Sequence, residues 1–150
     1  MISKLALGSA QFGMDYGIAG NKIVSTNDVK SILDFSYNLG INTIDTAFNY
    51  GKSESVLGKN NLKKWKIITK LPLIDIKKKD IKECIYDYFF ISMKRLNLKT
   101  LYGILLHFPD QLKSKFGQDI YASLNLLRNE GLVKKIGISI YDPNKLNFFI

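Results

Sequence analysis

Cysteine is nearly absent from this sequence, since Cys84 is the only one among 150 residues. One thiol excludes an internal disulfide and any metal site built from several thiolates, so we expect no metal. So little cysteine is typical of a reducing compartment, and we expect a cytoplasmic location. Long apolar runs are missing too: no stretch reaches the roughly 18 residues that a membrane span needs, and the first residues lack the apolar core of a signal peptide. We therefore expect no membrane partner.

Arginine is scarce in a chain whose net charge is +9, because only Arg95 and Arg128 stand among its 22 basic residues. Nucleic-acid-binding proteins favour arginine for bidentate contacts. The lysines are scattered and no helix-turn-helix, RNP or KH pattern is present, so we expect no nucleic-acid partner. The lysine excess leaves two interpretations open: a compositional bias of the whole genome, or attraction of a phosphate-bearing cofactor or anionic substrate.

Apolar residues make up 46% of the chain and aromatic residues 12%, which is enough for one packed domain. Five short aliphatic or β-branched runs alternate with helical patterns at the spacing of βα units. The runs cover residues 4–8, 42–45, 66–70, 101–107 and 134–140. This alternation predicts an α/β fold with a parallel sheet, either an open doubly wound sheet or a (β/α)8 barrel. No G-x-G-x-x-G motif follows the first run, which weighs against a doubly wound dinucleotide-binding sheet.

The segments between these runs carry helix signals. Residues 25–28 predict a capping box, with Gly40 just past the end of the helix that follows. Asp80 opens a longer helix whose apolar stripe includes Cys84, so we expect that thiol to be buried rather than nucleophilic. Four further expectations are an N-cap at Ser53, a helix over 118–130, the start of another helix at 142–146 and an exposed lysine loop at 77–79.

Titratable side chains close three of the five predicted strands: Asp45, Lys70 and His107. The carboxyl ends of parallel strands meet on one face, which is where barrel enzymes keep their sites. Tyr50 lies in the loop directly after Asp45, too close in sequence to leave that face. Each residue alone has an ordinary structural explanation, but their joint placement on one rim favours a site.

These four side-chain types suit the delivery of a proton to a carbonyl oxygen. The ordinary pKa of tyrosine is about 10, and we expect the Lys70 ammonium to stabilise the Tyr50 phenolate and lower that pKa. Asp45 would balance the charge of Lys70, and His107 would hydrogen-bond and orient the substrate oxygen. Because no nucleophile is present, the attacking species would come from elsewhere, such as a hydride from a nicotinamide.

The residues around Tyr50 resemble the aldo-keto reductase family. The run DTAFNYGKSE, residues 45–54, matches the family's D-T-A-x-x-Y-G-x-S-E signature at every fixed position. Four further segments of this chain are similar to segments of the family. Residues 7–13 resemble the family's first strand and loop, and residues 68–70 resemble its third strand with the lysine. Residues 105–107 resemble its fourth strand with the histidine, and residues 129–139 resemble its E-G-K-x-R-x-I-G-x-S stretch. The resemblance implies a (β/α)8 TIM barrel, truncated here to about the first four and a half βα units, with residues 1–150 as the N-terminal part of the barrel domain.

The resemblance also implies NAD(P)H-dependent reduction of a small-molecule carbonyl substrate, an aldehyde or ketone, to an alcohol. It makes Tyr50 the general acid, tuned by Lys70 and Asp45, with His107 orienting the carbonyl. NADPH is the expected cofactor and NADH the alternative. The implied cofactor contacts are Gly8, Ser9, Gln11, Asp45 and Ser139. Many members have Asn directly after that serine, whereas this chain has Ile140, so one hydrogen bond to the carboxamide is expected to be missing.

A whole barrel needs about 250 residues, and the family's later strands hold the adenosine phosphate of the cofactor. We therefore expect two open sheet edges in this chain and self-association that covers them. A second function stays open: a non-catalytic binding or regulatory protein on a degenerate scaffold of the same family.

Overall fold

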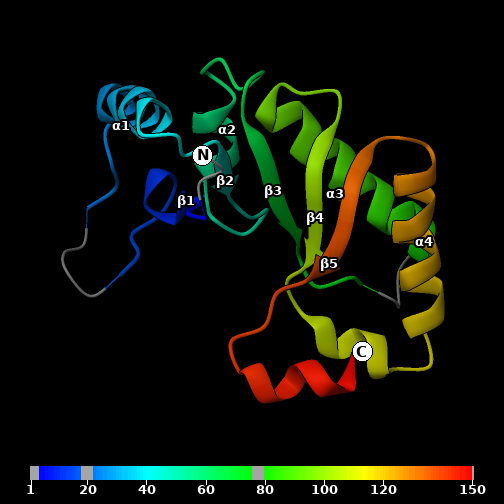
Figure 1. Cartoon of the computed structure of the whole chain (residues 1–150). Coiled ribbons are helices and arrows are strands. Elements are labelled where there is room, and N and C mark those ends of the chain that lie inside the picture. The colour runs from blue at the N-terminus through cyan, green and yellow to red at the C-terminus, as the bar shows by residue number, and fades with distance from the viewer. Residues whose placement is uncertain (1–3, 18–21, 76–79, 150) are drawn as a thin grey trace.

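The computed structural model describes residues 4–17, 22–75 and 80–149, in which five strands alternate with helices (Figure 1). The strands are β1 (Leu7–Gly8), β2 (Thr43–Asp45), β3 (Lys66–Leu71), β4 (Leu101–Leu106) and β5 (Val133–Ile138). The α-helices are α1 (Thr26–Asn38), α2 (Ser53–Leu57), α3 (Ile81–Leu96) and α4 (Gly117–Asn129), and short 3-10 helices span Ala10–Phe12, Pro109–Lys113 and Pro143–Phe148. All five predicted strands are confirmed, although β1 has only two residues. The lysine loop predicted at 77–79 lies outside the described residues.

The order of the strands decides between the two architectures that the sequence left open. The sheet runs β1-β2-β3-β4-β5, and every neighbouring pair is parallel. A doubly wound sheet reverses its order at a switch point, whereas these strands follow the chain without reversal. The fold is therefore an α/β fold of the barrel type.

Two helices begin where the sequence predicts, because side chains cap their first backbone N–H groups. The Oγ atom of Ser25 accepts a hydrogen bond from the Asp28 N–H at 3.2 Å at the start of α1. The Asp80 carboxylate accepts one from the Glu83 N–H at 3.1 Å at the start of α3. Cys84 follows on the buried face of α3, as predicted.

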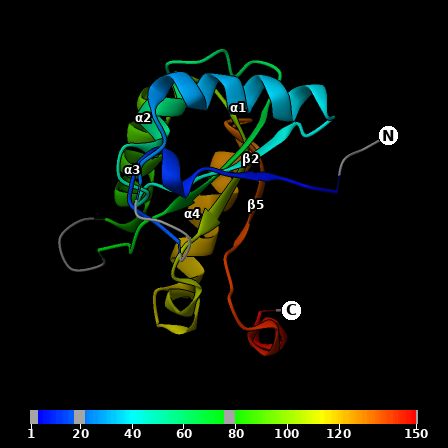
Figure 2. The ribbon, with the colours of Figure 1, turned by 90° about the vertical axis from the view of Figure 1, so that its left-hand side faces the viewer.

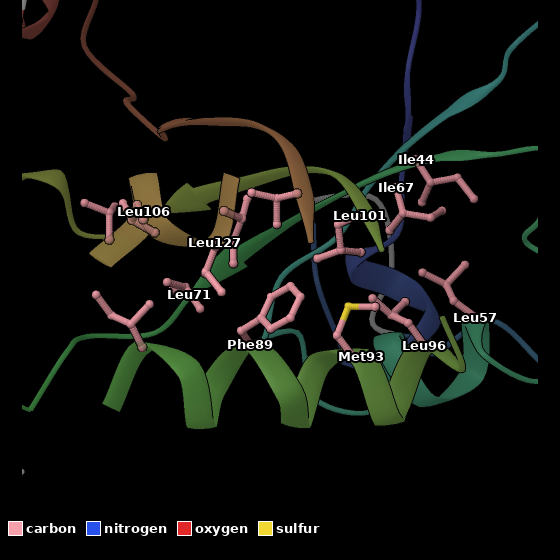
Figure 3. Packing of buried hydrophobic residues seen from close by; sticks show 14 of the residues in the cluster. Ile44, Leu57, Ile67, Leu71, Phe89, Met93, Leu96, Leu101, Leu106 and Leu127 are labelled. Atoms are coloured by element: carbon pink, nitrogen blue, oxygen red, sulfur yellow. The ribbon is translucent and has the colours of Figure 1, made fainter. Parts of the chain in front are cut away.

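One apolar core joins the sheet to its helices. In Figure 3, Phe89, Met93 and Leu96 point from α3 toward strand residues that include Ile67 and Leu71. Phe89, Ile67 and Leu71 are all at most 1% exposed. Burial of one such side chain contributes about 1.5–3 kcal/mol relative to exposure, so this layer holds the strands in place beneath the site.

The opposite face of the sheet is less covered. Ile67 is buried, whereas its neighbour Ile68 points the other way and is half-exposed. Small residues face Ile68 and Leu105 there: a Cβ atom on Gly103 would lie 3.4 Å from Ile68, and one on Gly137 would lie 3.0 Å from Leu105. This apolar, half-exposed face leads up to the carboxyl ends of the strands.

Within the described residues, no helix has both the length and the apolarity needed to cross a bilayer.

The two sheet edges generate a test of self-association. Within the described residues, β1 and β5 each pair with one strand only (Figures 1 and 2), so their outer backbone groups are free to pair with another copy. We expect the urea midpoint of the chain to rise with protein concentration, because association stabilises the folded state by mass action. The net charge of +9 opposes association, so the concentration dependence should grow as salt screens it. A midpoint independent of concentration at high salt, with a monomer in sedimentation, would contradict this expectation.

Candidate active site

The structure brings the four predicted catalytic side chains together at the carboxyl edge of the sheet. Asp45 is the last residue of β2, Lys70 is the last but one of β3, and His107 directly follows β4. Tyr50 reaches the same place from the loop between β2 and α2. Its ring centroid lies 5.9 Å from that of His107, and its hydroxyl lies 3.4 Å from the Lys70 Nζ atom.

The Lys70 ammonium is the centre of this group. Its side chain is only 7% exposed, and a buried charge is stable only when it is paired and hydrogen-bonded. Nζ donates to the Asp45 carboxylate at 2.6 Å, to the Thr46 carbonyl at 3.0 Å and to the Tyr50 hydroxyl at 3.4 Å. An ammonium has three protons, so these three acceptors account for all of them.

The pKa of Tyr50 is not lowered as the sequence analysis expected. Burial raises the pKa of Tyr50 above its usual 10.0, and the charges of Asp45 and Tyr16 raise it further. The expectation was wrong because it counted only the Lys70 charge: it neglected burial of the phenol, which is the larger effect, and the Asp45 carboxylate that lies 2.6 Å from the ammonium. The phenol is therefore protonated at neutral pH, which is the state that a proton donor requires.

His107 is neutral at the same pH. Burial lowers the pKa of His107 below its usual 6.5, and the Lys70 charge lowers it further against an opposing effect of Asp45. Its Nδ1 atom is buried without a partner among the described residues. The ring also borders a hollow of about 530 Å³ that Ser139 helps to line.

Two glycines allow the Tyr50 loop to lie directly against the loop after β1. A Cβ atom on Gly13 would meet the Ser53 nitrogen at 1.9 Å, and one on Gly51 would meet the Gly13 oxygen at 2.3 Å. Gly51 also has φ +55, a conformation that glycine adopts without strain. The Lys52 N–H donates to the Gly13 carbonyl at 3.1 Å. The two loops are thus fixed to each other beside Tyr50.

Ser53 has a different role from the predicted N-cap. The N-cap position of α2 is Lys52, which caps with no side-chain hydrogen bond, and Ser53 is the first helical residue. The Ser53 hydroxyl is fully buried and lies 2.8 Å from the Ser9 carbonyl, 2.9 Å from the Ser9 hydroxyl and 3.1 Å from the Thr46 hydroxyl. This cluster joins the end of β1 to the end of β2. A capping pattern considers only residues close along the chain, so it does not predict these contacts with a distant strand.

Glu54 and Arg95 form a second buried network that the sequence analysis missed. The Glu54 carboxylate is 1% exposed, accepts from the Thr69 hydroxyl at 2.7 Å and pairs with the Arg95 guanidinium at 3.3 Å. Arg95 in turn lies 4.2 Å from the centroid of the Phe48 ring and donates to the Phe48 carbonyl at 3.4 Å. Glu54 thereby connects the strand that carries Lys70 to the loop that carries Tyr50. The sequence did contain one indication of this network: Glu54 stands at a fixed position of the D-T-A-x-x-Y-G-x-S-E signature, although the signature alone assigns no role to that position.

The residues predicted to contact a cofactor occupy the same edge in different environments. Gly8 ends β1, and a Cβ atom there would meet nothing within 4 Å. Ser9 is fully buried, and its hydroxyl donates to the Asp45 carbonyl at 3.1 Å. Gln11 is exposed, with its amide donating to the Tyr16 carbonyl at 2.8 Å. Ser139 directly follows β5 and is half-buried, as is Ile140 after it.

Within residues 4–17, 22–75 and 80–149, no three His, Cys, Asp or Glu side chains gather as metal ligands do.

The comparison with protein families agrees with the fold and with this arrangement. The model of the aldo/keto reductase family matches residues 4–147 of the chain. The chain therefore belongs to the aldo/keto reductase family. No curated protein sequence matches it.

Solved structures of the family share the fold. A Pseudomonas aeruginosa protein described as an aldo-keto reductase is 29% identical, with a TM-score of 0.77 over 92% of this chain and 56% of its own. An aldo-keto reductase from Bacillus halodurans, in its holo form, is 22% identical, with a TM-score of 0.75 over 99% of this chain and 49% of its own. An aldo-keto reductase from Klebsiella pneumoniae in complex with NADPH is 22% identical, with a TM-score of 0.69 over 95% of this chain and 47% of its own. The chain spans about half the length of these solved structures.

The electrostatics of the site can be tested on His107, the only histidine of the chain. Proton NMR titration should give a midpoint below 6.5, because burial and the Lys70 charge both oppose protonation. In Lys70→Met the midpoint should move upward, since the repelling charge is gone and Asp45 is left unbalanced. Lys82→Met removes an exposed lysine of α3 and should leave the midpoint unchanged. A wild-type midpoint above 6.5, or equal midpoints in all three proteins, would count against this account.

The Glu54 network can be tested by urea denaturation. Glu54→Gln should lower the free energy of unfolding by about 1–2 kcal/mol, because it leaves the partly exposed Arg95 guanidinium without its anion. The matched control is Asp34→Asn, which breaks the exposed pair with Lys30 and should change stability by less than about 0.5 kcal/mol. Equal effects of the two changes would show that the buried network does not stabilise the fold.

Proposed function

We propose that the chain carries the catalytic group of an NAD(P)H-dependent reductase that converts an aldehyde or ketone to an alcohol. One observation supports this most directly: the Tyr50 hydroxyl lies 3.4 Å from a buried ammonium that is itself paired with Asp45 at 2.6 Å. A phenol so placed can give up a proton while the charge left behind is stabilised. Residues 1–150 would then form the N-terminal part of a barrel domain, as the unreversed strand order and the family signature suggest.

The strand ends at this edge carry groups suited to a nicotinamide. The space above Gly8 is open. Asp45 lies half-buried at the end of the neighbouring strand β2, and Ser139 lies half-buried after β5, at the other edge of the sheet. We propose that Gly8, Gln11, Asp45 and Ser139 contact the cofactor, and that Ser9 contributes through its backbone because its hydroxyl is bonded to Asp45. NADPH and NADP are bound by two related solved structures, so NADPH is the first cofactor to test and NADH the second.

The chemistry follows from the protonation states at this edge. A bound reduced nicotinamide would supply the hydride to the carbonyl carbon. Tyr50, protonated at neutral pH, would donate its phenolic proton to the carbonyl oxygen as negative charge develops there. Lys70, held by Asp45, would stabilise the resulting phenolate. Neutral His107 would hydrogen-bond the carbonyl oxygen and orient it toward Tyr50.

A second candidate function is ligand binding without turnover. The Asp45 carboxylate is 37% exposed and the adjoining face of the sheet is half-exposed, so water reaches the site in this arrangement of the described residues. Reductases exclude water from the reacting groups. A regulatory or binding protein would keep the same contacts to a cofactor without needing that exclusion.

Turnover by Tyr50→Phe separates these functions. With NADPH and a panel of aldehydes, the reductase function predicts loss of absorbance at the reduced-nicotinamide band. Tyr50→Phe should reduce that rate by about 10²–10⁴-fold, because proton transfer is lost while the ring remains. Tyr121→Phe is the matched control: Tyr121 is an exposed residue of α4 outside the candidate site, and this change should keep the wild-type rate.

Two results would contradict the reductase function. Equal turnover by wild type and Tyr50→Phe would remove the proposed proton donor. NADPH binding seen by fluorescence, with no turnover of any aldehyde, would favour the binding function instead.

A further inference from the structure

A second hollow lies at the opposite end of the sheet from Tyr50. It measures about 650 Å³ and is lined from the segments where β3, β4 and β5 begin, at the upper end of β4 and β5 in Figure 1. The site around Lys70 lies at the other ends of these strands, roughly 20 Å away by the rise of a six-residue strand. The hollow is therefore separate from the candidate active site.

The lining of this hollow is strongly basic. Lys63, Lys99, Arg128 and Lys134 all border it, and no Asp or Glu is among the described residues that line it. All four side chains are exposed, and none is ion-paired with a residue in the described part of the chain. Like charges gathered in one concavity repel each other and raise the local potential for an anion.

The floor of the hollow strengthens that potential. Leu62, Trp65 and Ile67 line it and are at most 8% exposed. An apolar floor has a low dielectric constant, so it screens the rim charges less than water would and focuses their field into the concavity.

Lysines from two different strands also approach one aromatic ring at this place. The Lys66 Nζ atom lies 5.5 Å and the Lys134 Nζ atom 5.9 Å from the centroid of the Tyr102 ring, which borders the hollow. Arg128 lies in the last turn of α4, where it also offsets the negative end of the helix. Lys63, Lys99 and Lys134 lie outside the helices and are not explained in that way.

We propose that this basic hollow binds a polyphosphate chain, either free or carried by a nucleotide. A triphosphate brings several negative charges into one small volume, which matches four cations better than a single carboxylate does. Lysine binds phosphate as a point charge, and the volume lies within the usual range for small-molecule pockets. The reductase function neither requires nor excludes this site.

Trp65 provides the test, because it is the only tryptophan of the chain and lies in the floor of the hollow. Titration of the full chain with inorganic tripolyphosphate at physiological salt should change its fluorescence saturably. The triple variant Lys63→Gln, Lys99→Gln, Lys134→Gln should weaken this binding by about tenfold or more. The matched control, Lys22→Gln, Lys82→Gln, Lys115→Gln, removes the same charge from residues at the other end of the strands and should bind nearly as the wild type does.

Three outcomes would overturn the proposal: no saturable signal, equal weakening in both triple variants, or equally tight binding of a glutamate oligomer. A parallel titration with ATP identifies the source of the phosphates. Tighter binding of ATP than of tripolyphosphate supports a nucleotide at this site, and equal binding supports a free polyphosphate.

Discussion

The charge of the Lys70 ammonium, held away from water, is the constraint on which the candidate site depends. Its three protons are donated to the Asp45 carboxylate at the end of β2, to the Thr46 carbonyl directly after it and to the Tyr50 hydroxyl. Removal of any one of these acceptors would leave a buried donor unsatisfied. The ammonium therefore fixes Asp45 and Tyr50 relative to each other, because both must stay within hydrogen-bond distance of the same Nζ atom. The loop between Asp45 and Tyr50 consequently has little conformational freedom.

Two buried polar networks hold the surrounding backbone in the position that this ammonium requires. The Ser53 hydroxyl links the ends of β1 and β2, and the Glu54 carboxylate links β3 to α3. Both residues belong to the signature run, yet neither touches the Tyr50 hydroxyl. The signature run of ten residues thus contains both the side chains of the candidate site, Asp45 and Tyr50, and the side chains that position them, Ser53 and Glu54. With these supports in place, burial sets the protonation states: Tyr50 stays protonated and His107 stays neutral at pH 7.

Charge is distributed unevenly between the two ends of the sheet. At the carboxyl edge the cation Lys70 is neutralised by Asp45, so the charges of the candidate site are balanced. At the amino edge several cations gather around a hollow without a carboxylate among its described lining residues. The net charge of +9 is therefore partly a local property of one end of the fold. The sequence alone is compatible with two causes of this charge, a compositional bias or attraction of phosphate, and the amino edge gives the second interpretation a physical location.

The sequence by itself determined the local structure, because caps and apolar periodicity act between residues close along the chain. Ser25 and Asp80 cap the predicted helices, all five strands lie where the aliphatic runs predict them, and the run from Asp45 identifies the family. Only the tertiary structure decided the strand order, the Ser53 cluster and the raised pKa of Tyr50. Each of these depends on groups far apart in sequence; the pKa of Tyr50, for example, is raised first by burial of the phenol and then by the charge of Asp45. Electrostatic and hydrogen-bonding effects of this kind depend on distance in space, and the chain must fold before those distances exist.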